Sequence, residues 1–309
     1  MKTKVWIALL AVYLIWGSTY LAIRFAVETI PPFLMAGTRF LIAGIVLFIW
    51  RWLAGDPLPT RRQWGSAAIV GLLLMLGGNG LVSWSEKHVA SGIAALLIGS
   101  VPLFMVIIES LRRGGLRPGW QSVLGLVTGF GGIFLLVGPD ALKGMQTHLD
   151  LLAIGALLLA ALLWSIGSVY SKTADLPASS LMGTGLEMLC GGIGLYLAGA
   201  SFGEWKMLQI SSITFKSWLA LAYLVVFGSM LGFVAYGWLL RHAPISLVAT
   251  YAYVNPVVAI CLGAWLGKEH LDLRTIIAAL VIISSVILIN TSRQSRIVQQ
   301  DETASPAAE

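Results

Sequence analysis

The sequence predicts an all-α integral membrane protein, built from ten transmembrane helices in two inverted five-helix repeats. Of its 309 residues, 58% are hydrophobic and 11% are charged, whereas soluble domains have about 25% charged residues. Several apolar runs reach the roughly 20 residues that a helix needs to cross a hydrocarbon core about 30 Å thick. The second half of the chain also repeats a pattern of the first, so we expect two related halves.

The repeat is clearest in the motif near the end of the first apolar run. A variant of Trp16-Gly17-Ser18-Thr19-Tyr20 returns near the midpoint as Trp164-Ser165-Ile166-Gly167-Ser168-Val169-Tyr170, and Trp164 lies 148 residues after Trp16. The next run matches at the same offset, where Gly37, Leu41, Gly44, Ile45 and Leu47 correspond to Gly185, Leu189, Gly192, Ile193 and Leu195. A match of this length indicates that one unit was duplicated.

The apolar runs give ten spans in order. The first run follows Lys2 and Lys4, and we interpret it as a retained span because no small-residue cleavage site precedes Arg24. The spans are expected at about 5–27, 33–53, 64–84, 89–111, 119–138, 151–171, 178–200, 216–238, 245–267 and 273–292. The first repeat then covers 5–138 and the second covers 151–292. The polar segment 293–309 is expected to be a disordered cytoplasmic tail.

The distribution of positive charge predicts the orientation. Twelve Lys and Arg residues fall in one set of alternate loops and six in the other, with Arg24 and Arg39 inside spans. Because cytoplasmic loops carry the excess of positive charge, both termini are predicted to lie in the cytoplasm. Five spans in each half invert the second repeat relative to the first, and this arrangement suits alternating access.

The composition and motifs also argue against several classes of function. The net charge of +6 does not indicate nucleic-acid binding, because the basic residues lie in short loops rather than in one basic segment. Cys190 and Cys261 lie inside apolar runs and are interpreted as small buried residues. The sequence has no Gly-x-x-x-x-Gly-Lys-Ser/Thr loop, no His-Glu-x-x-His motif and no Cys/His cluster. We therefore expect neither ATP hydrolysis nor a bound metal or other cofactor.

Arg39 and Glu187 occupy equivalent positions in the two repeats and carry opposite charges. A charge at a helix centre costs about 2.5–3.5 kcal/mol, which exceeds what one leucine or isoleucine returns. Both side chains are therefore expected to face a wet cavity or a partner. Arg39 would be a substrate anchor, and Glu187 would be a substrate or proton site. The alternative is a structural ion pair, or side chains that snorkel to the interface.

Two prolines predict interruptions in corresponding spans. Pro102 lies near the middle of span four and Pro256 near the middle of span nine, where proline removes a backbone donor and clashes with the preceding turn. Such paired helix breaks point to a transporter's binding site, although a kink that only shapes packing is the alternative. Polar side chains accompany these spans and spans three and eight: Asn255 beside Pro256, Asn79 in a glycine-rich run, and Ser229.

Six aromatic residues lie deeper in their spans than the rest. These residues could line a cavity that accepts amphipathic or aromatic solutes, and they are Trp16, Tyr20, Trp164, Tyr170, Tyr251 and Tyr253. Simple packing explains these side chains equally well.

Four stretches carry a family resemblance: Trp16-Gly17-Ser18-Thr19-Tyr20 with Arg24, Ala94 to Phe104, Tyr251 to Ala259, and Gly267-Lys268-Glu269. Together they resemble the EamA-type branch of the drug/metabolite transporter superfamily. The resemblance implies a ten-helix bundle in a bacterial cytoplasmic (inner) membrane, and efflux or exchange of small metabolites, amino acids among them. The family's acidic residue after span nine is present as Glu269. The comparable place after span four reads Gly114-Gly115-Leu116-Arg117, without an acid.

The predicted function is therefore secondary active transport by alternating access rather than catalysis. The expected partners are the lipid bilayer and a small organic substrate, either an amino acid or an amphipathic drug-like solute. A membrane-embedded enzyme acting on a lipid or lipid-linked substrate is the alternative, and it would need a clustered acid–base or metal set at one membrane face. The predicted substrate-binding residues are Trp16, Tyr20, Arg39, Asn79, Trp164, Glu187, Ser229, Tyr251 and Asn255. The sequence does not indicate an oligomeric state.

Overall fold

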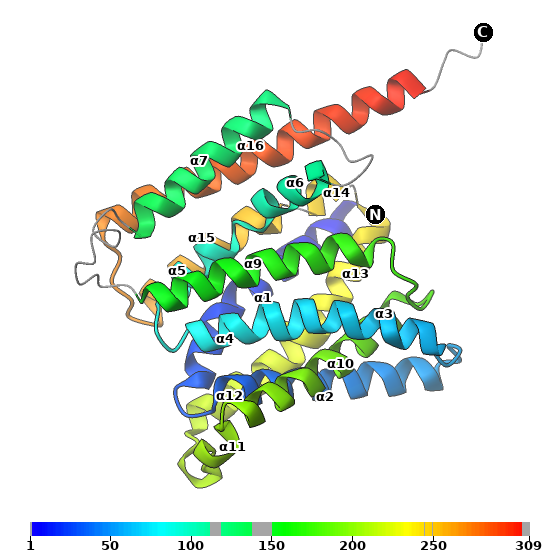
Figure 1. The fold of residues 1–309 in the computed structure, drawn as a ribbon, viewed down its shortest axis with the longest axis vertical. Helices are drawn as coiled ribbons and strands as arrows, with labels where there is room; N and C mark the ends of the chain where they lie inside the picture. Colours follow the sequence, from blue (N-terminus) through cyan, green and yellow to red (C-terminus); the bar gives the residue numbers. More distant parts are fainter. Residues whose placement is uncertain (1, 112–118, 138–149, 244, 249, 305–309) are drawn as a thin grey trace.

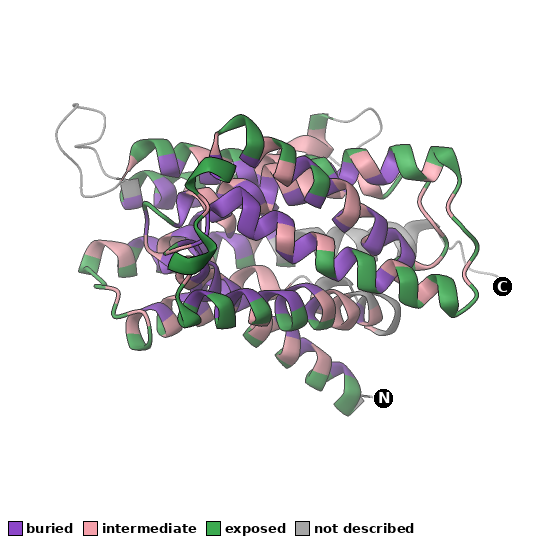
Figure 2. Ribbon diagram, turned by 90° about the horizontal axis from the view of Figure 1, so that it is seen from below, coloured by how far each residue is buried: buried purple, intermediate pink, exposed green. Residues whose placement is uncertain are grey.

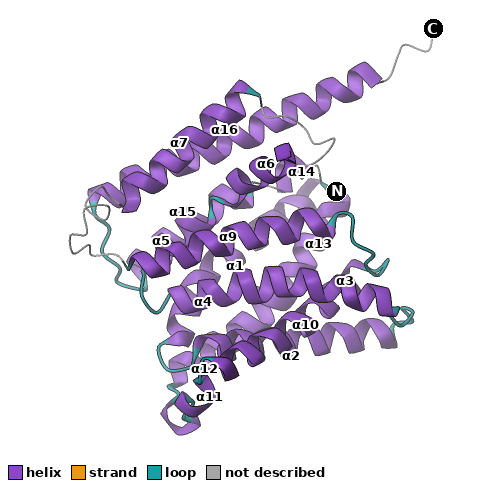
Figure 3. Ribbon diagram, viewed as in Figure 1, coloured by secondary structure: helices purple, strands orange, loops and turns teal. Residues whose placement is uncertain are grey.

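The computed structural model describes residues 2–111, 119–137, 150–243, 245–248 and 250–304, and these residues form helices and their connections without strands (Figure 3). The first half contains α1 (Lys2–Val27), α2 (Pro32–Leu53), α3 (Arg61–Gly71), η1 (Leu72–Gly80), α4 (Leu81–Ser85), α5 (Ser91–Ile98), α6 (Val101–Leu111) and α7 (Trp120–Val137). The second half contains α9 (Leu151–Ser171), α10 (Ser180–Ser201), α11 (Glu204–Met207), η2 (Ile210–Ser212), α12 (Phe215–Tyr223), η3 (Leu224–Leu231), α13 (Gly232–His242), α14 (Ile245–Val248), α15 (Tyr251–Trp265) and α16 (Leu273–Ala304).

The helices are those of a multi-pass membrane protein. Within the described residues, seven continuous helical stretches are long and apolar enough to cross a bilayer, and three shorter apolar helices cover 120–136, 251–265 and 273–289. Large apolar side chains such as Trp6, Leu53 and Trp120 are half or more exposed, and exposed residues cover the outside of the bundle in Figure 2. In lipid such a surface is favourable. The prediction of an all-α membrane fold with about ten spans is confirmed.

Equivalent spans of the two halves run in opposite directions. Near the end of α1, Arg24 Nη1 donates a hydrogen bond to the carbonyl oxygen of Val89, 2.8 Å away, just before α5. Asp150, just before α9 begins, lies 3.3 Å from His88 in the same connection. The end of α1 and the start of α9 therefore lie at one end of the bundle. The start of α1 and the end of α16 both lie toward the other end, although well apart (Figure 1).

Equivalent helices also pack against each other across the two halves. The longest contacts join α2 to α10 and α7 to α16 (Figure 1). Small residues permit the close approach of the first pair: a Cβ added at Gly44 would lie 3.0 Å from the backbone nitrogen of Leu189 and the carbonyl oxygen of Gly185. Close backbone approach at small residues is the usual means of helix association in lipid.

Two carboxylates, one from α11 and one from the loop after α15, satisfy helix N-termini at the end of the bundle where α1 ends. Glu204 accepts hydrogen bonds from the backbone N–H groups of Phe33 and Leu34, at 3.3 and 3.0 Å, in the first turn of α2. Glu269 accepts one from the backbone N–H of Ser91 at 2.8 Å, in the first turn of α5. The first N–H groups of a helix have no partner within it, and a negative charge there is favourable. These contacts fix where α2 and α5 begin.

The structure differs from the sequence expectation in the C-terminal segment. The segment from Arg293 was predicted to be disordered, but α16 continues as a helix to Ala304. No proline or glycine lies between Arg293 and Ala304, and most residues there have adequate helix propensity, so a helix already begun in the membrane can propagate. Residues 305–309 lie outside the described residues, as does the Gly114–Arg117 segment.

Candidate functional site

Spans three and eight each contain a π-helical segment in their middle. Leu72–Gly80 forms η1 between α3 and α4, and Leu224–Leu231 forms η3 between α12 and α13. π-Helical turns are rare, mostly short, and frequent at functional sites. Both segments contain the glycine-rich sequence that the repeat places at equivalent positions, Gly77-Gly78-Asn79-Gly80 in η1 and Gly228-Ser229 in η3.

A tryptophan of the repeated motif packs on each segment, and each comes from the other half. Trp16 Nε1 of α1 donates a hydrogen bond to the carbonyl oxygen of Gly228 in η3, at 3.2 Å. Trp164 of α9 lies against η1, where a Cβ added at Gly78 would lie 2.8 Å from its ring carbon Cε3. Each half therefore supplies a tryptophan that packs on the π-helical segment of the other half. We call the contact of Trp16 with η3 the η3 crossing, and the contact of Trp164 with η1 the η1 crossing.

The η3 crossing also holds the buried Arg39. Its Nε donates a hydrogen bond to Ser229 Oγ at 2.7 Å, and the guanidinium carbon lies 4.8 Å from the centre of the Phe40 ring. The residue is 4% exposed. Gly228 makes room for it, because a Cβ there would lie 3.1 Å from Nη2 of Arg39 and 3.0 Å from Thr19 Cγ2.

No carboxylate pairs with Arg39 in the described part of the chain, where the ion pairs within 4.0 Å involve other residues. A buried charge is costly unless it is paired and fully hydrogen-bonded. A guanidinium presents five donors in a planar fork that matches a carboxylate or phosphate. Arg39 is therefore a buried cation suited to an anionic ligand.

Aromatic rings surround Trp16 at this crossing. The Trp16 ring centre lies 5.3 Å from that of Phe233, 5.1 Å from Tyr236 and 5.3 Å from Tyr251. The rings of Tyr236 and Tyr251 lie 5.8 Å apart, nearly perpendicular. The spacing and edge-on geometry are those of favourable aromatic pairs, so these rings form a packed wall in the structure described.

Two other predicted residues lie near this wall. Tyr20 is one turn further along α1 from Trp16 and is partly buried. Asn255 of α15 is 6% exposed, and its side-chain Oδ1 has no hydrogen-bond partner among the described residues. The backbone carbonyl oxygen of Asn255 would lie 3.2 Å from a Cβ at Gly17. The η3 side thus brings together Trp16, Tyr20, Arg39, Ser229, Tyr251 and Asn255 from α1, α2, η3 and α15.

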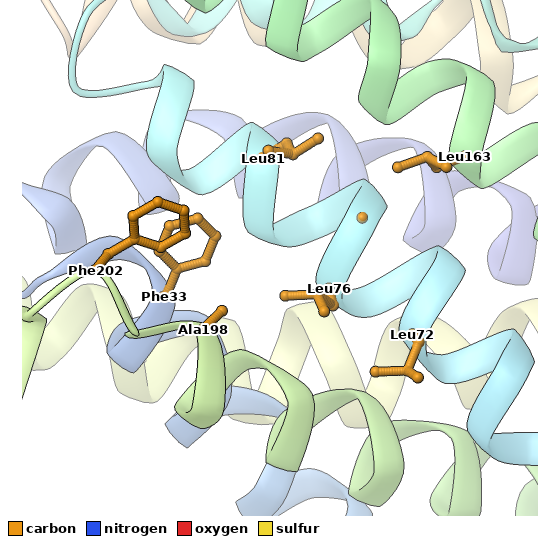
Figure 4. Close-up of a pocket in the computed structure, with 8 residues that line it drawn as sticks. Phe33, Leu72, Leu76, Leu81, Leu163, Ala198 and Phe202 are labelled. Carbon is orange, nitrogen blue, oxygen red and sulfur yellow. The ribbon is translucent and has the colours of Figure 1, made fainter. Parts of the chain in front are cut away.

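The η1 crossing is apolar by comparison. Asn79 Nδ2 donates a weak hydrogen bond to the carbonyl oxygen of Leu74 at 3.3 Å, within its own segment. A groove of about 370 Å³ runs beside the segment (Figure 4). Its lining residues carry no polar side chain and are Phe33, Leu72, Leu76, Gly77, Leu81, Leu163, Ala198 and Phe202.

Glu187 does not join Arg39. It lies on α10, is partly buried, and forms no ion pair among the described residues. Its backbone carbonyl packs so closely on α3 that a Cβ at Gly71 would collide with the oxygen. The equivalent positions of the repeat therefore face different surroundings: Arg39 reaches η3, while the Glu187 backbone packs on α3.

The two prolines differ in their effect on the helix. In span four the helix stops at Ile98 and restarts at Val101, so a break at Gly99-Ser100 directly precedes Pro102. The hydroxyl of Ser165 donates to the carbonyl oxygen of Val101 at 3.1 Å. In span nine, Pro256 lies inside the continuous helix α15, and the interruption comes earlier, before Tyr251. Tertiary contacts around Thr250, which bonds Tyr13, accompany that earlier break.

Sequence reasoning missed a charged group at the end of α4. Glu86 is 2% exposed, and within the described parts of the chain neither of its carboxylate oxygens has a hydrogen-bond partner. Arg24 and Glu269 lie nearby and form a 3.5 Å ion pair. Glu86 follows the apolar run in a sequence, Ser85-Glu86-Lys87-His88, that is typical of a solvated loop, so no signal in the sequence marks its burial.

Comparison with known proteins places the chain among membrane transporters. The EamA-like transporter family matches residues 3–138 and again 151–291. The "Uncharacterized inner membrane transporter YedA" of Escherichia coli (strain K12) is 40% identical over 287 residues, covering 93% of this chain and 90% of that protein. The "Uncharacterized transporter YoaV" of Bacillus subtilis is 27% identical and covers 95% and 98%. One crystal structure shares the fold with a TM-score of 0.64 at 20% identity, covering 93% of this chain and 97% of that one.

Proposed function

The chain belongs to the EamA-like transporter family, and from this premise we propose that it exports or exchanges small organic metabolites by alternating access. The observation that carries the proposal is the unpaired Arg39 at the η3 crossing, 4% exposed and held by Ser229. A buried charge inside a membrane protein is costly and by default marks a substrate or ion pathway.

The chemistry of the η3 crossing supports a substrate class. Arg39 offers donors to a carboxylate, and the aromatic wall of Trp16, Tyr236 and Tyr251 offers apolar surface beside it. Pockets for small molecules combine mostly apolar walls with a few polar anchors. We therefore infer that the substrate carries a carboxylate and an apolar or aromatic group, as many amino acids do.

The paired π-helical segments support the mode of transport. Each crossing joins a tryptophan of one half to a glycine-containing π-helical segment of the other. Repeats of inverted topology change access when one half rocks against the other around a fixed site. The crossings are the contacts that such a movement has to rearrange, so we place the moving parts there.

Membrane orientation completes the proposal. The set of alternate loops with the larger number of Lys and Arg residues includes Lys2 and Lys4 at the start of α1, so we propose that the end of the bundle where α1 starts is cytoplasmic. The end that holds Glu86, Glu204 and Glu269 then faces outward. A bacterial cytoplasmic membrane is the proposed location.

A transport panel in proteoliposomes tests the function. The purified protein would be reconstituted and loaded in turn with each of the twenty radiolabelled protein amino acids and with the cationic dye ethidium, with and without a proton gradient. We expect protein-dependent movement of at least one carboxylate solute, lost in Arg39→Ala, and no preference for ethidium. Liposomes without protein are the control.

Two outcomes would contradict the proposal. Transport of ethidium but of no carboxylate solute would contradict the hypothesis that Arg39 binds the anionic group of the substrate. No flux of any solute, together with a protein-dependent change in the liposome lipids, would favour a membrane-embedded lipid enzyme instead.

A further inference from the structure

Glu86 differs from the other buried carboxylates at the outward end of the bundle. Glu204 is hydrogen-bonded to two backbone N–H groups of α2. Glu269 accepts three hydrogen bonds from Ser91 and Gly92, and it lies 3.5 Å from Arg24. Glu86 is 2% exposed, yet neither of its carboxylate oxygens has a hydrogen-bond partner among the residues that the structure describes. An ionised carboxylate is costly in such a place, whereas the neutral acid is much less so.

The groups around Glu86 do not neutralise it directly. The charged and titratable groups that act on it come from three elements: Tyr20 and Arg24 of α1, Arg39 of α2, and Glu269 of the loop after α15. Arg24 is already engaged with Val89 and Glu269, and Arg39 with Ser229. The neighbouring His88 pairs with Asp150. Neither arginine forms an ion pair with Glu86 within the described residues.

Glu86 lies one residue beyond the end of the spanning helix, and its surroundings favour the protonated form. Burial raises the pKa of its carboxyl well above the usual value, and the negative charge of Glu269 adds to this effect. The positive charge of Arg24, the nearby backbone N–H of Arg24 and the positive charge of Arg39 oppose it and lower this pKa. A carboxyl poised in this way can bind a proton under conditions in which exposed carboxylates stay ionised.

We propose that Glu86 is a proton-binding site that sets the strength of the anion anchor at Arg39. The step is the addition of one proton from the outward side to the carboxylate, which forms a neutral carboxylic acid; no other bond forms or breaks. The ionised carboxylate partly cancels the positive charge of Arg39, and the protonated one does not. The part of the inference that concerns Arg39 rests on the proposed function.

The linkage has a definite sign. Protonation of Glu86 strengthens binding of a carboxylate at Arg39, and by reciprocity the bound carboxylate strengthens protonation of Glu86. A proton and a substrate carboxylate then bind together rather than in competition. This favours exchange of one carboxylate solute for another over export driven by the proton gradient, because that gradient pulls bound protons inward.

Infrared titration of the purified protein tests the proton site without any substrate. The C=O stretching band of a protonated carboxyl would be followed as pH rises, in wild type, Glu86→Gln and Glu28→Gln. Glu28 is an exposed residue paired with Lys216 and serves as the matched control. We expect a component that persists above the range of exposed carboxylates, and that only Glu86→Gln removes. If Glu86→Gln fails to fold, Glu86→Asp should shift this component instead.

Equilibrium binding tests the link to Arg39, with radiolabelled benzoate as a probe that combines a carboxylate and an aromatic ring. At pH values where benzoate stays ionised, wild-type affinity should fall by at least about fivefold as pH rises, within the range usual for coupled sites. Glu86→Gln should bind benzoate tightly and lose most of this pH dependence, and Arg39→Ala should bind weakly throughout.

The outcomes separate this inference from the proposed function. An infrared component unchanged in Glu86→Gln, or a benzoate pH dependence unchanged in that variant, would overturn the inference even if carboxylate transport is found. Loss of both in Glu86→Gln would support the inference even if the transport panel shows no flux, because neither measurement requires movement across a membrane.

Discussion

The η3 crossing and the η1 crossing are built on the same plan but differ in chemistry. At both, a tryptophan from the Trp16/Trp164 motif packs on a glycine of a π-helical segment in the opposite half. At η3 the tryptophan donates a hydrogen bond to the segment, and Arg39 with Ser229 lies beside it. At η1 the neighbouring groove is lined by apolar side chains.

This difference shows that the helix scaffold is repeated in the two halves, whereas the polar and charged side chains at the η3 crossing are not. The backbone features recur because both copies need the same helix crossings to form the bundle. The positive charge does not recur: the equivalent position of the second half holds Glu187, and each buried charge costs stability. We therefore expect transport to depend on the η3 crossing and folding to depend on both.

Arg39→Ala should reveal the largest difference in transport rate between a change at the η3 crossing and a change at the equivalent position of the other half. Hydrogen bonds to charged groups contribute about 1.5–3 kcal/mol, so the initial rate of carboxylate transport should fall about 10- to 100-fold. The rate would be measured in proteoliposomes with the solute that the panel identifies. Glu187→Gln, at the equivalent position of the repeat, should lose less. Equal losses of transport rate in the two variants would mean that transport depends equally on both halves.

Gly71→Ala tests whether the η1 side depends on close backbone packing. The added methyl group would collide with the carbonyl oxygen of Glu187, and overpacking of this kind costs about 1–3 kcal/mol. The thermal unfolding temperature in detergent should fall. The matched control is Gly155→Ala in α9, where a Cβ meets nothing within 4 Å. An unchanged unfolding temperature in Gly71→Ala would show that α3 and α10 can separate without loss.

Ser229→Ala tests how much carboxylate transport depends on the hydrogen bond between Arg39 and Ser229. The variant leaves the Arg39 Nε–H without its acceptor at 2.7 Å, which costs about 1.5 kcal/mol and should slow carboxylate transport about tenfold. Ser201→Ala removes a hydroxyl that bonds only within its own helix and provides the comparison. Faster transport in Ser229→Ala would indicate that Ser229 holds Arg39 away from the substrate.

Trp16→Phe and Trp164→Phe should give the smallest difference in transport rate between the two crossings. The first removes the hydrogen bond from Nε1 to the carbonyl oxygen of Gly228 and keeps an aromatic ring, so transport should fall by a factor that corresponds to about 0.5–1 kcal/mol. The contact of Trp164 with η1 is made through a ring carbon, so Trp164→Phe should change the rate less. A larger loss in Trp164→Phe would reverse our assignment of the crossings.

Much of the fold could be predicted from local sequence features. Span ends followed from apolar runs and prolines: α2 begins at Pro32 and α9 covers Leu151–Ser171, the range predicted for span six. Helix geometry within a span was harder to predict. The break near Pro102 precedes the proline directly, whereas α15 continues through Pro256 and the chain is interrupted before Tyr251. A proline weakens one helical turn, but contacts from other helices decide where the turn opens.

About ten membrane crossings and two related halves could be predicted from the amino-acid sequence, because apolar length and an internal repeat are properties of the linear chain. The sequence also marked Arg39 as a costly charge. That Arg39 meets Ser229, that Glu187 does not pair with it, and that Glu86 is buried became visible in the folded structure alone. The physical reason is that the energy of a charge depends on which helices surround it, and residues far apart in the sequence supply those surroundings.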